Sequence, residues 1–244
     1  MEIIPKIENL AGVNNFDEIL AVSDGIMVAR GDLGVEVPAE DVPVIQKEII
    51  RKCNAVGKPV IVATQMLESM TTNPRPTRAE VSDVGNAIFD GADAIMLSGE
   101  TASGDYPVEA VKTMSTIALR MEESLEYDTI IRSRSIRERS SVTDAVSHAT
   151  VQLAYETSAA AILTPTQSGY TTRVVSKYRP KAMIVAYAPS PMIARHINLR
   201  WGVYPMQGRK WTSVEDMIES CTRGALSHGY VAQGDKVVMV AGMT

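Results

Sequence analysis

The sequence predicts an α/β protein with parallel sheets, divided into two domains. Three observations support this class: short apolar runs recur along the chain, segments with helical spacing separate them, and a polar stretch interrupts the alternation at 132–141. Strands that alternate with helices pair in parallel, because each helix returns the chain to the same end of the sheet. We therefore expect two successive β/α domains joined by a polar connector.

The first domain is predicted to have the order βαβαβαβα. Its four strands lie in the apolar runs at 3–4, 25–29, 59–63 and 92–97. Two of its helices carry start signals. Thr77 and Glu80 have the spacing of a capping box, and Pro107 suits the first turn of a helix that we expect to end near Glu126.

The second domain is predicted to be an open α/β layer structure. A helix is expected at 142–157, and further helices after Thr171, at 191–197 and at 213–228, where Gly229 supplies a stop signal. The predicted strands lie at 160–163, 183–186 and 237–240.

Composition favours a soluble globular protein that acts on small molecules. The 244 residues are 45% hydrophobic and 22% charged, and the net charge of -5 argues against a nucleic-acid surface. The apolar runs reach only about five residues, too few for a membrane span, and no signal-peptide pattern is present, so we expect a cytoplasmic protein. Cys53 and Cys221 are expected to be buried free thiols.

Polar side chains follow every predicted strand of the first domain. Because the ends of parallel strands share one face, where barrels of this type place their active sites, we expect these residues to form one site. The residues are Lys6 and Glu8, then Arg30, Gly31 and Asp32, then Thr64 and Gln65, then Ser98, Gly99 and Glu100.

The side-chain types at these positions suit a magnesium site for an oxyanion. Mg²⁺ takes one or two protein carboxylates and completes its shell with water and substrate oxygens, so Glu8 and Asp32 suffice as anchors. A set of hard oxygens without Cys or His argues against zinc. Lys6 can stabilise negative charge on a reacting oxygen, while Thr64 and Ser98 can donate hydrogen bonds.

Structural explanations remain open for each motif alone. Lys6 and Glu8 could be an exposed strand pair, residues 30–34 a glycine turn with a salt bridge, and residues 98–101 a loop with a helix cap. Their repeated placement at strand ends is what favours function.

A hydroxyl-rich loop at 164–172 enters a helix in the second domain. Backbone amides at a helix start, together with hydroxyl groups, can bind phosphate, and the alternative is an ordinary cap with a turn glycine. The three histidines, His148, His196 and His228, are expected to be structural or surface residues, since no carboxylate or cysteine shares their spacing.

Five motifs together resemble the pyruvate kinase family. They lie at 4–9, 25–34, 63–70, 73–80 and 96–101, and the similarity continues through 177–180 into the second domain. The resemblance implies the C-terminal half of a TIM (β/α)8 barrel at 1–130, a linker at 131–141, and an open three-layer α/β regulatory domain at 142–244 that lacks its final loop and strand.

The resemblance implies phosphoryl transfer from phosphoenolpyruvate to ADP, giving pyruvate and ATP in the last step of glycolysis. By position, Glu8 and Asp32 would hold Mg²⁺ or Mn²⁺, and Lys6 would stabilise the enolate. The substrate carboxylate would be held by the backbone amides of Gly31 and Asp32 and by the Thr64 hydroxyl. Glu100 would also contact the substrate, and Ser98 would lie nearby and help to deliver a proton through water.

The loop of the second domain resembles the family's allosteric effector site. A sugar phosphate or nucleotide would bind there, with its phosphate on Thr166, Ser168, Gly169 and Thr171. Trp211 is a candidate effector contact, whereas Trp201 is expected in the core because it precedes a strand-like segment at 203–204. The family forms homo-oligomers, usually tetramers.

Some family features fall outside the resemblance. The resemblance covers the last four of the family's eight barrel strands. It does not include the substrate-phosphate arginine, the K⁺ ligands or the lid domain over the nucleotide. Ala11 stands where the family generally has an acidic or polar residue. We therefore expect the 244-residue chain to be inactive alone. The alternatives are a noncatalytic effector-binding or assembly module, and another magnesium-dependent phosphoenolpyruvate or pyruvate barrel enzyme, such as an aldolase or mutase.

Overall fold

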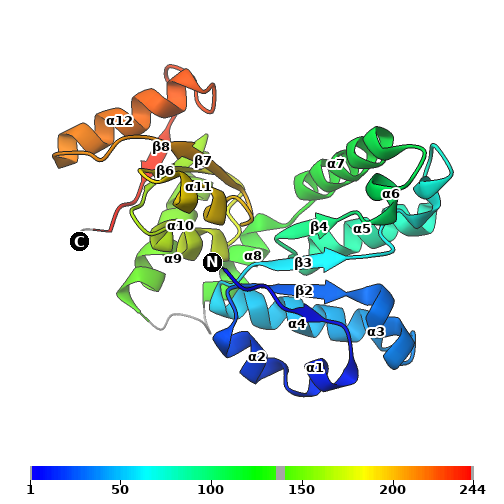
Figure 1. The fold of residues 1–244 in the computed structure, drawn as a ribbon. Helices are drawn as coiled ribbons and strands as arrows, with labels where there is room; N and C mark the ends of the chain where they lie inside the picture. The colour runs from blue at the N-terminus through cyan, green and yellow to red at the C-terminus, as the bar shows by residue number, and fades with distance from the viewer. Residues whose placement is uncertain (1, 136–140, 243–244) are drawn as a thin grey trace. The chain divides into compact units, whose positions relative to one another are not determined.

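The computed structural model describes residues 2–135 and 141–242, and the chain divides into two compact units, Met1–Leu125 and Glu126–Thr244 (Figure 1). The predicted connector at 131–141 overlaps a helix, α8 (Tyr127–Ser135), while its residues 136–140 lie outside the described part of the chain. The domain limits 1–130 and 142–244 remain a proposal.

The first unit contains one parallel sheet whose strands follow the chain order β1-β2-β3-β4. The strands are β1 (Lys6–Ile7), β2 (Ile26–Ala29), β3 (Val60–Ala63) and β4 (Ala94–Met96). The strand predicted at 3–4 is therefore displaced, because pairing with β2 begins only at Lys6, which lies within β1. Eight helical segments connect or follow them: α1 (Leu10–Asn14), α2 (Phe16–Val22), α3 (Arg30–Glu36), α4 (Val42–Val56), the 3-10 helix η1 (Glu68–Thr71), α5 (Arg78–Asp90), α6 (Gly99–Ala102) and α7 (Pro107–Glu123).

Local sequence signals fix the ends of the longer helices. The Thr77 hydroxyl accepts from the Glu80 N–H, and the Glu80 carboxylate accepts from the Thr77 N–H, which confirms the predicted capping box at the start of α5. Pro107 opens α7 as expected, and that helix ends at Glu123. Gly57 and Gly91 end α4 and α5 in the left-handed conformation that glycine adopts without steric cost.

The core of the first unit lies between the sheet and its longer helices. Val28 and Val62 of the central strands pack in one cluster with residues of α4, α5 and α7. Full burial of each such side chain contributes about 1.5–3 kcal/mol. This packing fixes the strands, and with them the residues at the strand ends.

The second unit contains a parallel sheet of order β7-β6-β5-β8. Its strands are β5 (Ala161–Pro165), β6 (Met183–Ala188), β7 (Val203–Gln207) and β8 (Val237–Met239). In addition to α8, its helices are α9 (Val142–Glu156), α10 (Tyr170–Lys177), α11 (Pro191–Ile197) and α12 (Val214–Ser227).

Alternation along β5 and β6 produces three layers. Ile162 and Ile184 belong to a core cluster with α9, α10 and α11, whereas Leu163 and Val185 point to the opposite face and pack in a second cluster with α12. The predicted open α/β layer arrangement follows from this alternation. The sequence indicated only a strand-like segment at 203–204, whereas β7 runs to Gln207. Pro205 interrupts the apolar pattern of this strand.

Both cysteines are buried free thiols, as expected. Within the described residues, no helix has the length and apolar character needed to cross a membrane.

Candidate functional site

The four strand ends of the first unit lie along one edge of its sheet. Ile7 pairs with Val28, Val28 with Val62, and Val62 with Ile95, so the residues that follow each strand emerge on the same side. This register places the predicted site residues at one end of the sheet, where contacts join Lys6 with Glu8 and Asp32, and Gly31 with Thr64.

Lys6 joins the two predicted metal ligands. Its Nζ lies 2.6 Å from Glu8 Oε2 and 3.5 Å from Asp32 Oδ2. The hydrogen bond and the charge of Glu8 raise the pKa of Lys6, and Asp32 raises it further. All three side chains are at least partly exposed, so a substrate can reach this cluster, and Lys6 carries its positive charge at neutral pH.

The donor set of Glu8 and Asp32 fits a hard divalent cation. Among the described residues, no group of three or more His, Cys, Asp or Glu side chains lies where it could form a metal cage. Mg²⁺ needs no such cage. Glu8 Oε2 is buried, and its close contact within the described chain is the one with Lys6.

Gly31 and Thr64 meet at the ends of β2 and β3. The Gly31 N–H donates to Thr64 Oγ1 at 2.8 Å, and the Thr64 hydroxyl donates to its neighbour's carbonyl, that of Ala63, at 2.6 Å. A Cβ atom at position 31 would lie 3.3 Å from Thr64 Oγ1, which explains the glycine. The amide and the hydroxyl are therefore adjacent, and each donates within the chain here, so a substrate carboxylate would have to replace these two acceptors.

The loop after β3 has a strained backbone. Thr64 and Gln65 have φ angles of 69° and 54°, which is uncommon for residues other than glycine. Arg30 holds this conformation: its Nη2 donates to the carbonyl oxygens of Thr64 and Gln65 at 2.8 and 3.0 Å, and its Nη1 pairs with Asp83 at 2.6 Å. The sequence suggested a salt bridge in this motif but gave no signal that the partner is 53 residues away.

Ser98 and Glu100 lie where β4 ends. Ser98 is half-buried and immediately precedes α6. Glu100 has no exposed surface, and its two oxygens accept from the backbone N–H groups of Leu67 at 3.1 Å and Ser98 at 2.7 Å. The expected direct contact of Glu100 with substrate does not fit this burial.

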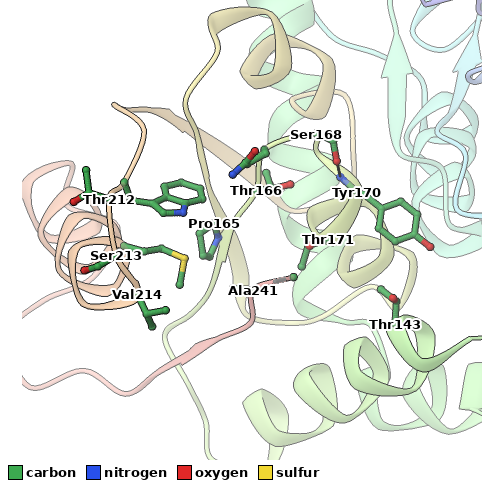
Figure 2. Close-up of a pocket in the computed structure, with 14 residues that line it drawn as sticks. Thr143, Pro165, Thr166, Ser168, Tyr170, Thr171, Thr212, Ser213, Val214 and Ala241 are labelled. Carbon is green, nitrogen blue, oxygen red and sulfur yellow. Dashed lines mark hydrogen bonds between the residues drawn. The ribbon is translucent and has the colours of Figure 1, made fainter. Parts of the chain in front are cut away.

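The predicted effector loop borders a cavity of about 540 Å³ in the second unit (Figure 2). Thr166, Ser168 and Thr171 line it and face a second segment that contains Thr212, Ser213 and Val214. Gly169 instead lies buried at the start of α10 with a φ of 84°, and its N–H donates to Thr166 Oγ1 at 2.9 Å.

The wall of this cavity is uncharged and combines hydroxyl groups with aromatic and apolar side chains. Within the described residues, its lining contains no Asp, Glu, Lys, Arg or His side chain. Trp211 lines the cavity, in agreement with its expected position, whereas Trp201 is 7% exposed and packs in the core, as expected. Hydroxyl and amide donors beside an indole ring can bind one phosphate and an attached ring.

Comparison with known proteins identifies both units. Residues 1–111 match the family described as pyruvate kinase, barrel domain, and residues 144–244 match pyruvate kinase, alpha/beta domain. The chain is 56% identical to a pyruvate kinase of Bacillus licheniformis, over 99% of this chain and 41% of that protein. It is 55% identical to a pyruvate kinase of Clostridium acetobutylicum, over 100% of this chain and 51% of that protein.

A solved structure gives the same result. The crystal structure of a pyruvate kinase from Cryptosporidium parvum matches with a TM-score of 0.95 and 43% identity, over 99% of this chain and 49% of that one. The chain thus spans about half the length of the relatives it matches. The chain belongs to the pyruvate kinase family, with the C-terminal half of the (β/α)8 barrel in its first unit and the family's α/β domain in its second.

Proposed function

We propose that this chain forms part of an enzyme that transfers a phosphoryl group from phosphoenolpyruvate to ADP, giving pyruvate and ATP. The observation that carries the proposal is the contact of Lys6 with both Glu8 and Asp32, beside the paired Gly31 amide and Thr64 hydroxyl. A cation, an ammonium group and a carboxylate-binding pair on one sheet edge are what this reaction needs.

The chain's own residues have distinct roles in this proposal. The Gly31 and Asp32 amides and the Thr64 hydroxyl hold the substrate carboxylate and orient the enol group toward Lys6. As the phosphoryl group leaves, the Lys6 ammonium opposes the negative charge that develops on the enolate oxygen. Ser98 passes a proton through water to the enolate carbon, which completes pyruvate.

Glu8 and Asp32 would hold Mg²⁺ or Mn²⁺, with water and substrate oxygens in the remaining positions. The bound cation supplies positive charge against the oxygens of the phosphoryl and enolate groups. K⁺ belongs to the complete family enzyme, and the proposal assigns no K⁺ ligand to these 244 residues.

The test is a coupled assay of pyruvate formation by the complete protein that carries these residues. Asp32→Asn is expected to lower kcat/KM by about 100-fold or more, since it weakens the cation site. Asp17→Asn is the matched control, because Asp17 pairs with Lys52 on the surface of α2. Absence of pyruvate formation by the unaltered complete protein in the presence of Mg²⁺ and K⁺ would refute the proposal.

The 244-residue chain alone is expected to be inactive, because a four-stranded sheet supplies only part of the electrostatic site. Turnover by the purified chain that is abolished in the Lys6→Met variant would contradict this expectation. The noncatalytic module and the other barrel enzymes remain the alternatives. Two assays without ADP separate the latter: condensation of pyruvate or phosphoenolpyruvate with an aldehyde for an aldolase, and rearrangement of phosphoenolpyruvate to a phosphonate for a mutase.

We also propose that the cavity of the second unit binds an effector, with its phosphate on Thr166, Ser168 and Thr171 beside the Gly169 turn. The uncharged wall favours a monophosphate, because a bisphosphate brings more negative charge than hydroxyl groups offset. Calorimetry with ribose 5-phosphate, AMP and fructose bisphosphate tests this order. Thr171→Val is expected to weaken binding, and Thr116→Val on α7 is the matched control.

Effector binding without magnesium-dependent substrate binding by the complete protein would favour the noncatalytic module instead. We further propose a homo-oligomer, a tetramer as in the family, that is located in the cytoplasm and binds neither nucleic acid nor membrane. The net charge of -5 supports the last two points. Sedimentation of the complete protein tests the oligomeric state.

A further inference from the structure

We propose that Glu100 is a positioning residue that ties the loop after β3 to the loop after β4. One carboxylate oxygen accepts from the Leu67 N–H at 3.1 Å, and the other accepts from the Ser98 N–H at 2.7 Å. The first amide belongs to the segment that follows Thr64, and the second to the residue proposed to pass a proton. The inference rests on the proposed function.

The burial of Glu100 excludes direct contact with a substrate. The residue has 0% exposed surface, and both oxygens are already bound to backbone groups. A buried carboxylate is unfavourable unless hydrogen bonds compensate it, and bonds from N–H groups to an ionised oxygen are the stronger kind. A carboxylate therefore suits this position, because its two oxygens can each accept a hydrogen bond from a backbone N–H group.

Two buried side chains of opposite charge hold the loop at Thr64–Leu67. Arg30, from the end of β2, binds the carbonyl oxygens of Thr64 and Gln65, while Glu100, from the end of β4, binds the amide of Leu67. The Arg30 guanidinium thus donates to backbone carbonyl groups of this short segment, and the Glu100 carboxylate accepts from one of its N–H groups. Neighbouring strand ends on both sides fix the loop that carries the proposed substrate hydroxyl.

Arg30 and Glu100 together clamp the loop at 64–67, and this clamp accounts for the position of two proposed site residues. Thr64 Oγ1 stays 2.8 Å from the Gly31 N–H while its own backbone remains left-handed. Ser98 is held through its amide by the carboxylate two residues later. Glu100→Gln has nearly the same shape but replaces one acceptor with an NH₂ donor, so one of the two amides loses its partner.

The substitution separates a positioning role from a proton-transfer role. In the complete protein, Glu100→Gln is expected to lower kcat/KM for phosphoenolpyruvate by about 10-fold to 100-fold through misplacement of the loops. The pH profile of kcat is expected to keep both of its limbs, because Glu100 moves no proton. Glu68→Gln, at an exposed position in the same connection, is the matched control and is expected to leave both quantities unchanged.

Amide hydrogen exchange tests the clamp without reference to activity. In the unaltered protein, the Leu67 and Ser98 amides are expected to exchange slowly, and Glu100→Gln should speed both relative to amides in the core of α4. Loss of one limb of the pH profile, unchanged kcat/KM with Glu100→Gln, or fast exchange of these amides in the unaltered protein would each overturn the proposal. Absent turnover with slow exchange would refute the proposed function and leave the clamp supported.

Discussion

Arg30 Nη1 lies 2.6 Å from Asp83 Oδ2 and connects the end of β2 to α5. The same guanidinium donates to the carbonyl oxygens of Thr64 and Gln65, so a single side chain links two successive β/α units. Its side chain is 9% exposed, which limits screening by water. The strained backbone of the loop after β3 therefore depends on a residue that precedes it by 34 positions.

Removal of this guanidinium should destabilise the first unit. Arg30→Met leaves the Thr64 and Gln65 carbonyls without their donor and is expected to reduce the free energy of unfolding by about 2 kcal/mol. Urea unfolding measures the change. Arg120→Met, which removes an exposed pair with Glu123 on α7, is the control and should cost less than about 0.5 kcal/mol. Equal losses of stability in the two variants would contradict the stabilising role of the Arg30 guanidinium.

Glu80 should make stability depend on pH. Burial by itself raises its pKa, but hydrogen bonds from Ser69 and Thr77 outweigh burial, so the pKa of the folded state lies below the ordinary value of 4.5. A lowered pKa means that the stabilisation is complete above about pH 4.5 and is lost as the pH falls through the folded-state pKa.

Glu80→Gln should therefore reduce the free energy of unfolding by about 1 kcal/mol at pH 7 and by much less at pH 3. Denaturant unfolding at both pH values provides the measurement. Glu109→Gln, in the first turn of α7, serves as control for the loss of one negative charge at a helix start. A difference between wild type and Glu80→Gln that is the same at both pH values would count against the capping role.

Gly169 and Gly202 offer a matched pair in the second unit. Both have positive φ angles, 84° and 64°, but a Cβ atom at Gly169 would meet Ile197 Cγ2 at 2.7 Å, whereas one at Gly202 would meet nothing within 4 Å. Gly202→Ala is expected to cost about 1 kcal/mol from backbone strain alone. Gly169→Ala should cost more and weaken phosphate binding. Thermal unfolding measures the loss of stability, and calorimetry measures the loss of phosphate affinity. Larger losses for Gly202→Ala than for Gly169→Ala would contradict this prediction.

The isolated 244-residue chain is expected to self-associate. Strands β1 and β4 form the two edges of the first sheet, and β4 is only half-buried along its length. Unpaired parallel edges beside partly exposed apolar residues favour association in water. Light scattering coupled to size-exclusion chromatography should give a mass that rises with concentration. A constant monomer mass over a wide concentration range would exclude this behaviour.

Local patterns predicted most of the fold. Apolar runs located six of the eight described strands, while the run at 3–4 lies just before β1 and β7 was recognised only as a short strand-like segment after Trp201. The capping box at Thr77 and Pro107 fixed the starts of α5 and α7, because these signals act within one turn of a helix. Placement of polar residues at four strand ends was enough to predict the cluster of Lys6, Glu8 and Asp32.

Contacts between distant segments could not be predicted in the same way. Nothing near Arg30 in the sequence indicates that it binds the loop at Thr64 or pairs with Asp83. Glu100 appeared to be a ligand-binding carboxylate because it follows a strand, and only its burial shows that its oxygens are already used. The left-handed conformation of Thr64 and Gln65 was equally hidden, since neither residue is a glycine.

The most direct test of this account is the initial rate of pyruvate formation by the complete protein with Lys6→Met, compared with Lys112→Met at an exposed position of α7. Lys6→Met is expected to lower kcat by at least about 100-fold while Mn²⁺ still binds, because Glu8 and Asp32 remain. Lys112→Met should retain full activity. Near-normal kcat in the Lys6→Met variant would contradict the role of Lys6 as the enolate stabiliser.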